Sequence, residues 1–137
     1  MIQLEGVCKQ FGAVEALQPL NLEVRQGEWL GLFGHNGSGK TTLLRILLGL
    51  SRPSGGQVLL DGAVPNAKVW KAFRNQCGFM PERISFYEHL TGEETLRYFA
   101  RLRGVDAEAA TGVLERVGLL EAARRQIGTY SKGMCQR

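Results

Sequence analysis

The sequence lacks the features that mark several classes of protein. Its three cysteines, Cys8, Cys77 and Cys135, lie far apart and form no CxxC pair, which argues against a zinc or disulfide framework and favours reduced thiols in a cytosolic protein. No apolar run is long enough to span a bilayer, and the N-terminal residues show no signal-peptide pattern. Repeats and low-complexity stretches are also absent. If the protein works at a membrane, we therefore expect it to dock on a partner.

Neither sign of charge is strongly in excess. The 17 Lys and Arg residues against 13 Asp and Glu residues give a formal net charge of +4. This mild excess suits a protein that binds a polyanion such as a nucleotide, although many solvated surfaces carry the same charge. The 137 residues, 44% of them apolar, suffice for one ordinary domain with a core and not for two independent domains.

The apolar pattern of the first fifty residues predicts an antiparallel edge sheet and then a buried strand and helix. Apolar and polar residues alternate over 2–5 and over 20–25, which is typical of half-buried strands. Residues 29–33 are apolar without alternation, as in a strand that is covered on both faces. Residues 41–50 are apolar nearly all round, which predicts a helix wedged against a sheet.

Further elements are expected along the rest of the chain. Residues 57–62 predict a strand and a tight turn, and residues 77–80 a short strand that ends at Pro81. From Thr91 onward the chain is predicted to be helical, because Thr91 and Glu94 form a capping box, and residues 96, 99, 100 and 103 share a face. Asp106 is expected to cap another helix, with residues 110, 113, 114 and 117 inward, that ends at Gly118.

A glycine-rich loop lies between the predicted buried strand and helix. It reads Gly34-His35-Asn36-Gly37-Ser38-Gly39-Lys40-Thr41 and matches the pattern GxxxxGK[ST]. Glycines allow successive N–H groups to turn inward as an anion nest, and a helix that begins near Gly39 aims its free amides at the same place. Lys40 supplies a positive charge for the β- and γ-phosphates, Thr41 a hydroxyl for Mg²⁺, and Thr42 a contact to the α-phosphate. The loop therefore predicts a nucleotide triphosphate site, which many ATPases and GTPases share.

A second motif narrows the choice of family. Residues 130–137 (YSKGMCQR) resemble the signature of ABC ATPases, usually written LSGGQ-x-Q-R. The matching residues are Ser131, Gly133, Gln136 and Arg137, and the departures are Tyr130, Lys132 and Met134. Ser131 follows Lys40 by 91 residues (131 minus 40), with a helical stretch between them, as in transporter-type ABC ATPases. The two motifs together resemble this family along the whole chain.

The resemblance implies an α/β fold of the P-loop NTPase class. The expected ABC-type nucleotide-binding domain has an antiparallel edge sheet, parallel core strands and a helical subdomain, and over residues 1–137 it would be incomplete at the C-terminus. Residues 1–82 would form the ATP-binding core with the loop at 34–41. Residues 83–130 would form the helical subdomain, and residues 130–137 the signature.

The resemblance also assigns roles to single residues. Because two such domains sandwich ATP in this family, Ser131 and Gly133 would contact the ATP held by a second copy. Phe11 stands where the family has an aromatic that stacks on adenine, although a lone phenylalanine is more often part of a core. Glu82 stands at the position of a glutamine that touches Mg²⁺. With Lys40 it is a candidate catalytic residue, and with Thr41 a candidate Mg²⁺ ligand, while the alternative for Glu82 is a plain surface glutamate.

One subgroup of the family has similar segments at 31–37, 81–102 and 129–134. Its members are the ATPase subunits of a copper-linked transporter that helps mature nitrous oxide reductase. The resemblance implies a cytoplasmic ATPase, peripheral on the cytoplasmic face of the inner membrane through an integral membrane permease. Phe86 and Tyr87 are candidate permease contacts, and packing inside the helical subdomain is the alternative. The cargo pathway is an analogy and not chemistry visible in these residues.

The expected catalytic parts that follow the signature in the family are not found in the sequence. We expect the chain to bind ATP and not to hydrolyse it at a useful rate, because the residues that position water are missing and His35 and His89 do not replace them. We also expect an exposed sheet edge and marginal stability. The alternatives are another ABC exporter, or a DNA-repair or translation ABC protein. The stretch between the motifs has no heptads and no paired cysteines, so no nucleic acid is expected as a partner.

Overall fold

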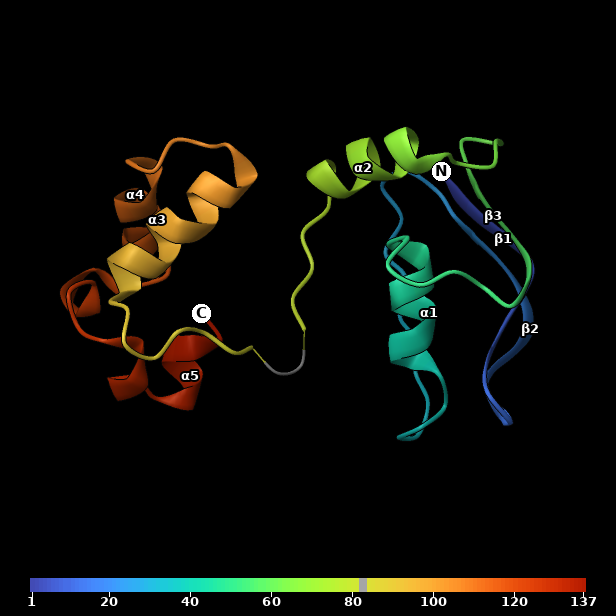
Figure 1. Cartoon of the computed structure of the whole chain (residues 1–137), viewed down its shortest axis with the longest axis horizontal. Coiled ribbons are helices and arrows are strands. Elements are labelled where there is room, and N and C mark those ends of the chain that lie inside the picture. The colour runs from blue at the N-terminus through green and yellow to red at the C-terminus, as the bar shows by residue number, and fades with distance from the viewer. Residues whose placement is uncertain (82–83) are drawn as a thin grey trace. The chain divides into compact units, whose positions relative to one another are not determined.

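The structure is a computed structural model of the chain, and it describes residues 1–81 and 84–137. The chain forms two compact units, Met1–Phe79 and Met80–Arg137. Figure 1 shows the strands in the first unit, together with helices, and helices alone in the second. The elements of the first unit are β1 (Ile2–Phe11), β2 (Val14–Val24), α1 (Lys40–Leu47), β3 (Gly55–Leu60) and α2 (Ala67–Gln76).

The sheet of the first unit is antiparallel, as the alternating pattern predicts. Its strand order is β2-β1-β3, and Leu4 in β1 lies opposite Leu22 in β2 and Val58 in β3. A two-residue turn follows β3, in which Leu60 and Ala63 exchange backbone hydrogen bonds of 2.9 and 3.1 Å. Asp61 takes the left-handed conformation there. The glycine that follows takes it too, at little energetic cost because it has no side chain. The predicted strand and tight turn are therefore confirmed.

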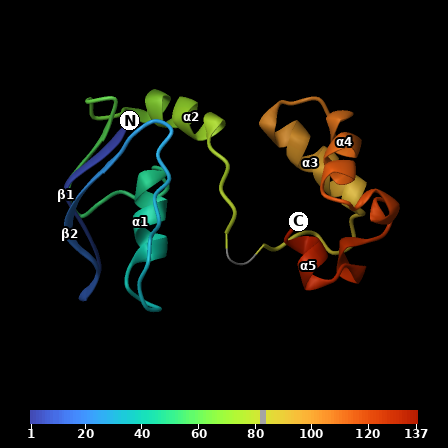
Figure 2. The ribbon, with the colours of Figure 1, turned by 180° about the vertical axis from the view of Figure 1, so that it is seen from behind.

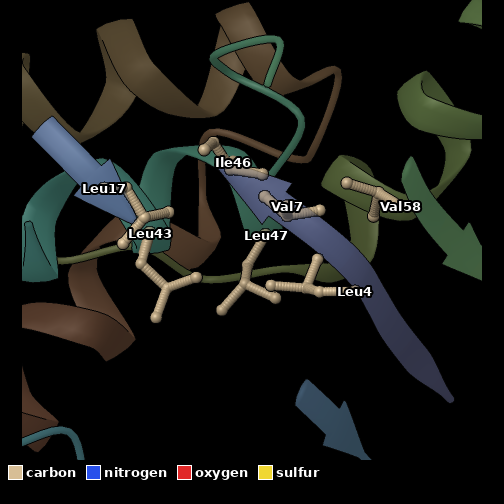
Figure 3. Close-up of a cluster of buried hydrophobic side chains, with 7 residues drawn as sticks. All are labelled: Leu4, Val7, Leu17, Leu43, Ile46, Leu47 and Val58. Atoms are coloured by element: carbon tan, nitrogen blue, oxygen red, sulfur yellow. The ribbon is translucent and has the colours of Figure 1, made fainter. Parts of the chain in front are cut away.

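The core of the first unit forms where α1 packs on the strands. Figure 3 shows the buried side chains, which are Leu4, Val7, Leu17, Leu43, Ile46, Leu47 and Val58. The three from α1 recur at helical spacing, so the helix is buried on one side only. Leu44 on the other side is 42% exposed, and the helix ends at Leu47, which corrects the expectation of a helix over 41–50 that is covered nearly all round.

Two predicted strands are not formed. Residues 29–33 have no strand assignment, and Trp29 and Phe33 are 99% and 93% exposed. Residues 77–80 also lack a strand assignment, and Met80 is exposed. A strand needs a neighbour that accepts and donates its backbone hydrogen bonds, and within residues 1–81 and 84–137 no strand pairs with either segment. Neither of the expected parallel core strands is therefore paired here.

The helix α2 was not predicted, although its start carries a clear signal. The Asn66 side chain accepts hydrogen bonds of 3.0 Å from the N–H groups of Lys68 and Val69, which satisfies two amides of the first turn. Trp70 of α2 packs against the core of the first unit, next to Gly49, where a Cβ would collide with its ring. An asparagine before an amphipathic stretch would have indicated this helix.

The second unit consists of helices. They are α3 (Gly92–Arg103), α4 (Ala109–Arg116), two short 3₁₀ helices (Leu120–Ala122 and Ile127–Thr129) and α5 (Lys132–Cys135). The predicted capping box at the start of α3 is confirmed: the Thr91 hydroxyl accepts from the Glu94 N–H at 3.2 Å, and the Glu94 carboxylate accepts from the Thr91 N–H at 2.8 Å. These contacts lower the pKa of Glu94: the hydrogen bond from the Thr91 N–H has the largest effect, and the hydrogen bond from the Thr91 hydroxyl the next largest.

The buried faces of α3 and α4 differ from the expected ones. Gly92 and Thr95 are the buried residues of α3, whereas Phe99 is exposed. In α4, Leu114 is buried as predicted and Val113 is exposed, and the side chain of residue 110 lies outside the described ones. The Asp106 carboxylate accepts from the Glu108 N–H at 2.9 Å, but Glu108 itself is the N-cap of α4. No helix within the described ranges combines the length and the hydropathy needed to cross a bilayer.

Candidate anion-binding site

The glycine-rich loop before α1 wraps around the side chain of Lys40. The Lys40 Nζ donates to the carbonyl oxygens of Gly34 and His35 at 2.6 Å each, and lies 3.4 Å from the Ser38 hydroxyl. Carbonyl oxygens are neutral acceptors, so they hold the ammonium in place without cancelling its charge. No ion pair links Lys40 to a carboxylate of residues 1–81 or 84–137. Among the residues that the structure describes, the charge of Lys40 is therefore not compensated by a carboxylate.

Glycines fix the shape of this loop. Gly37 and Gly39 have φ values of 85° and 88°, in the left-handed region that side-chain-bearing residues avoid. At Gly39 space is limiting as well, because a Cβ would collide with the backbone carbonyl oxygen of Ala16 in β2. At Gly37 a Cβ would meet no atom within 4 Å. Because it has no side chain, Gly39 therefore allows the end of the loop to lie directly against the sheet.

The start of α1 has no side-chain cap. Gly39 is its N-cap residue, and a glycine has no side chain to accept from the amides of the first turn. The first amide of α1 with a helical partner is that of Leu43, which donates to Gly39 at 2.8 Å. The N–H groups of Lys40, Thr41 and Thr42 come before it, in the first turn, where N–H groups have no acceptor within the helix. By contrast, side chains cap α2 and α3. The N-terminal end of α1 therefore offers an anion free N–H donors and the positive end of the helix dipole.

The residues of the loop also fit a magnesium ion that is held mainly by phosphate oxygens. Thr41 is exposed on the first turn of α1 and offers one hydroxyl oxygen. Mg²⁺ commonly takes one or two protein ligands and completes its shell with phosphate oxygens and water. Glu82, the other predicted ligand, lies outside the described residues. Among residues that are described, no group of three His, Cys, Asp or Glu forms a metal site of its own.

Phe11 lies at the end of β1 and is 55% exposed. The Lys9 Nζ lies 5.0 Å from the centre of its ring, a cation–π arrangement. Phe11 pairs with Val14 at the start of β2, two residues before Ala16, whose carbonyl oxygen faces Gly39. Figures 1 and 2 show the β1–β2 turn and the loop before α1 at the same end of the unit. Phe11 is thus an exposed ring at the loop's end of the sheet and not a core residue.

The predicted signature residues lie in the second unit. Ser131 is the N-cap of α5, and its hydroxyl accepts from the Met134 N–H at 3.2 Å. Gly133 is exposed, and a Cβ there would meet only the Ser131 hydroxyl, at 4.0 Å. Both residues therefore present small, open surfaces. Ser131 and Gly133 thus belong to the second unit, and the loop at 34–41 belongs to the first.

Tyr130, a departure from the signature pattern, has structural contacts that the pattern does not predict. Its hydroxyl donates to the carbonyl oxygen of Ala122 at 2.7 Å, and its ring packs in the small core of the second unit. Burial is the first cause that raises the pKa of this hydroxyl, so it remains a donor at neutral pH. The sequence did contain a signal for this hydrogen bond. A tyrosine replaces the usual leucine of the signature, and a buried tyrosine usually finds a hydrogen-bond partner.

Comparisons with known proteins bear on the family of the chain and on its fold. A family model described as "ABC transporter" matches residues 17–137. The uncharacterized ABC transporter ATP-binding protein YdbJ of Bacillus subtilis is 39% identical over 138 residues, which cover 100% of this chain and 44% of that protein. The bacitracin transport ATP-binding protein BcrA of Enterococcus faecalis is 37% identical, again over 100% of this chain and 44% of that protein. The chain spans less than half the length of these relatives.

Two solved structures are similar as well. One, described as an ATP-binding subunit of an ABC transporter, has a TM-score of 0.78 and 29% identity, and the match covers 99% of this chain and 58% of that one. The other is a dimeric ATP-binding cassette in a post-hydrolysis state with ADP and Pi, with a TM-score of 0.76 and 25% identity over 98% of this chain and 65% of that one. The expected fold class is therefore confirmed.

Proposed function

The chain belongs to the ABC transporter family, and from this premise we propose that residues 34–42 bind the triphosphate of ATP. The observation that carries the proposal is the convergence of a cation with free donors. The Lys40 ammonium rests on loop carbonyls at 2.6 Å, beside the uncapped first turn of α1. A triphosphate gives the ammonium anionic oxygens in place of neutral carbonyl oxygens, so that the attraction of opposite charges is added to the hydrogen bond. It also satisfies the amides of Lys40, Thr41 and Thr42.

In this proposal each residue of the site has a distinct task. Lys40 contacts the β- and γ-phosphates, and Thr42 lies next to the α-phosphate on the first turn. The Thr41 hydroxyl holds the magnesium ion, which supplies neutralisation of the phosphate charge when it is bound. Phe11 stacks on the adenine, because its exposed ring lies at the loop's end of the sheet. Glu82 remains a proposed Mg²⁺ contact that rests on its sequence position alone.

A second copy of the chain is proposed to complete the site. Ser131 and Gly133 are exposed and uncrowded, which suits contact with a phosphate held by another molecule. One solved relative is dimeric and holds ADP and Pi. We propose that this chain binds ATP and that on its own it hydrolyses ATP poorly or not at all.

The proposed membrane partner is a permease that docks on the second unit. Tyr87, Tyr98, Phe99 and Leu102 are all exposed there. The rings of Tyr98 and Tyr87 are 5.7 Å apart, and those of Tyr98 and Phe99 are 5.3 Å apart, so the residues form one aromatic patch. Phe86 lies beside it, 6.3 Å from Phe99. Such patches are typical of protein contacts, and a permease would place the ATPase on the cytoplasmic face of the membrane.

Two proposals stand for the cargo. A copper-linked pathway rests only on the resemblance of residues 31–37, 81–102 and 129–134 to one subgroup. None of the relatives described above carries a copper link in its name, and one of them is a bacitracin transport protein. Export of an antibiotic is therefore the second proposal. Growth of a host strain with and without the gene, challenged with copper or with bacitracin, separates the two.

Calorimetry with magnesium ATP tests the proposed function. The wild-type chain should take up one ATP, and Lys40→Ala should lose at least about ten-fold in affinity, because a charge-assisted hydrogen bond contributes about 1.5–3 kcal/mol. Lys68→Ala on α2 is the matched control, since it removes a lysine of the same unit outside the loop. Equal affinity of the Lys40 and Lys68 variants would refute the proposal.

A further inference from the structure

Tyr130 stands directly before Ser131, and its side chain ties this position to the start of α3. Its hydroxyl donates to Ala122 at 2.7 Å. On the other side it covers Gly92, where a Cβ would collide with the Tyr130 hydroxyl. We propose that Tyr130 is a positioning residue that holds Ser131 and the first turn of α5 against the N-terminal end of α3. This inference rests on the proposed role of Ser131 toward a nucleotide.

The surroundings of Tyr130 are already fixed by backbone hydrogen bonds. Residues 88–93 and 123–128 are linked by four of them: Ile127 N–H to Leu90 at 2.8 Å, Gly128 N–H to Glu88 at 3.0 Å, Gly92 N–H to Arg125 at 3.2 Å, and Glu93 N–H to Ala123 at 2.9 Å. These bonds stop at residue 128, three residues before Ser131. Beyond it, the Tyr130 N–H donates to the carbonyl oxygen of Ile127 at 2.9 Å, and the Tyr130 side chain adds a second attachment next to Ser131.

Packing alone does not fix the ring. A hollow of about 120 Å³ lies beside it, lined mostly by apolar side chains that include Leu96, Leu114 and Met134. On the side of this hollow the ring has few packing partners, so packing there does not hold it in place. The hydrogen bond to Ala122 opposes a shift of the ring into the hollow, because a hydroxyl that moves into an apolar hollow loses its partner. The bond to Ala122 therefore acts together with the Tyr130 N–H bond to Ile127 to fix the backbone of residue 130.

The position of Tyr130 also affects the N-cap of α5. The Ser131 hydroxyl accepts from the Met134 N–H at 3.2 Å and thereby starts a helix of only four residues. A helix this short depends on its cap and on tertiary contacts rather than on its own hydrogen bonds. A displaced Tyr130 would move Ser131 and open this cap. Loss of the Tyr130 bond should therefore loosen the signature segment while the rest of the unit stays folded.

Amide hydrogen exchange of the whole chain tests the inference. Tyr130→Phe keeps the ring and removes the donor, and Gly92→Ala displaces the hydroxyl from the opposite side. Both should speed exchange of the Met134 amide by about five- to ten-fold, the equivalent of one net hydrogen bond. The Leu114 amide in α4 should exchange as in the wild type. Tyr98→Phe, on the exposed aromatic patch, is the control and should change neither amide.

The outcomes separate the inference from the proposed function. Unchanged exchange at Met134 in Tyr130→Phe would overturn the role of Tyr130, whether or not ATP binds. At protein concentrations too low for pairing, magnesium ATP affinity should be the same in wild type and Tyr130→Phe, because the loop at 34–41 belongs to the other unit. Sedimentation with magnesium ATP should show weaker pairing of the variant than of the wild type, and equal pairing would also overturn the role. If the wild type binds no ATP, the proposed function fails while the exchange result still decides about Tyr130.

Discussion

At the scale of single residues, Gly39 combines two requirements that are usually separate. Its φ of 88° excludes most side chains, and the carbonyl oxygen of Ala16 occupies the space of a Cβ. Gly37 has nearly the same φ, 85°, but open space around it. The pair therefore allows the cost of backbone conformation to be measured apart from the cost of the contact with β2. Both residues belong to the loop that holds Lys40.

We predict that Gly39→Ala is more destabilising than Gly37→Ala. Both variants should lose about 1–2 kcal/mol for the left-handed conformation. Only Gly39→Ala should lose more, because α1 has to move away from β2, and it should also weaken ATP binding. Urea unfolding measures the free energies. Equal losses in the two variants would mean that the contact with Ala16 is not needed.

Thr95 is a second residue with a measurable role. It is 3% exposed, and its hydroxyl has no hydrogen-bond partner among the described residues. A buried hydroxyl without a partner costs about 1–3 kcal/mol, so Thr95→Val should raise the free energy of unfolding by about 1 kcal/mol. Thr91→Val, four residues earlier, should lower it by about 1 kcal/mol, because it removes a helix cap. A loss of stability in Thr95→Val would indicate that the hydroxyl has a partner.

At the scale of helices and strands, the sequence predicted best where the signal is local. The capping box of α3 and the turn after β3 need only neighbouring residues, and both were predicted correctly. The prediction of a strand at 29–33 was wrong. An apolar pattern shows that a segment is suited to a buried strand, but it does not show whether a partner strand is present. The loop at 34–41 was predicted from its spacing, whereas the contact of Gly39 with β2 and the bond of Tyr130 require the tertiary structure.

The uncovered segment at 29–33 leads to a prediction at this scale. Trp29 is 99% exposed, whereas Trp70 packs on the core of the first unit. The variant Trp70→Phe leaves Trp29 as the only tryptophan, and its fluorescence should resemble that of free tryptophan and be quenched readily by acrylamide. In Trp29→Phe, the remaining Trp70 should be shielded. Shielded emission from Trp29 in the monomer would show that residues 29–33 are covered.

At the scale of the whole molecule, the chain is a family member with two small cores. One gathers around α1 and the strands, and the other around Leu114, Leu119 and Ala123. The proposed ATP loop lies in the first unit and the proposed signature residues in the second. In the proposal, binding of the phosphates belongs to Met1–Phe79, and contact with the nucleotide of a second copy belongs to Met80–Arg137.

Amide chemical shifts of the whole chain during a titration with magnesium ATP test the central claim most directly. If the uncapped start of α1 takes the phosphates, the N–H signals of Lys40, Thr41 and Thr42 should shift together and saturate at one ATP per chain. The N–H signals of Lys68 and Val69, which Asn66 already caps at the start of α2, should not move. Saturable binding that leaves the three α1 amides unchanged would contradict the account.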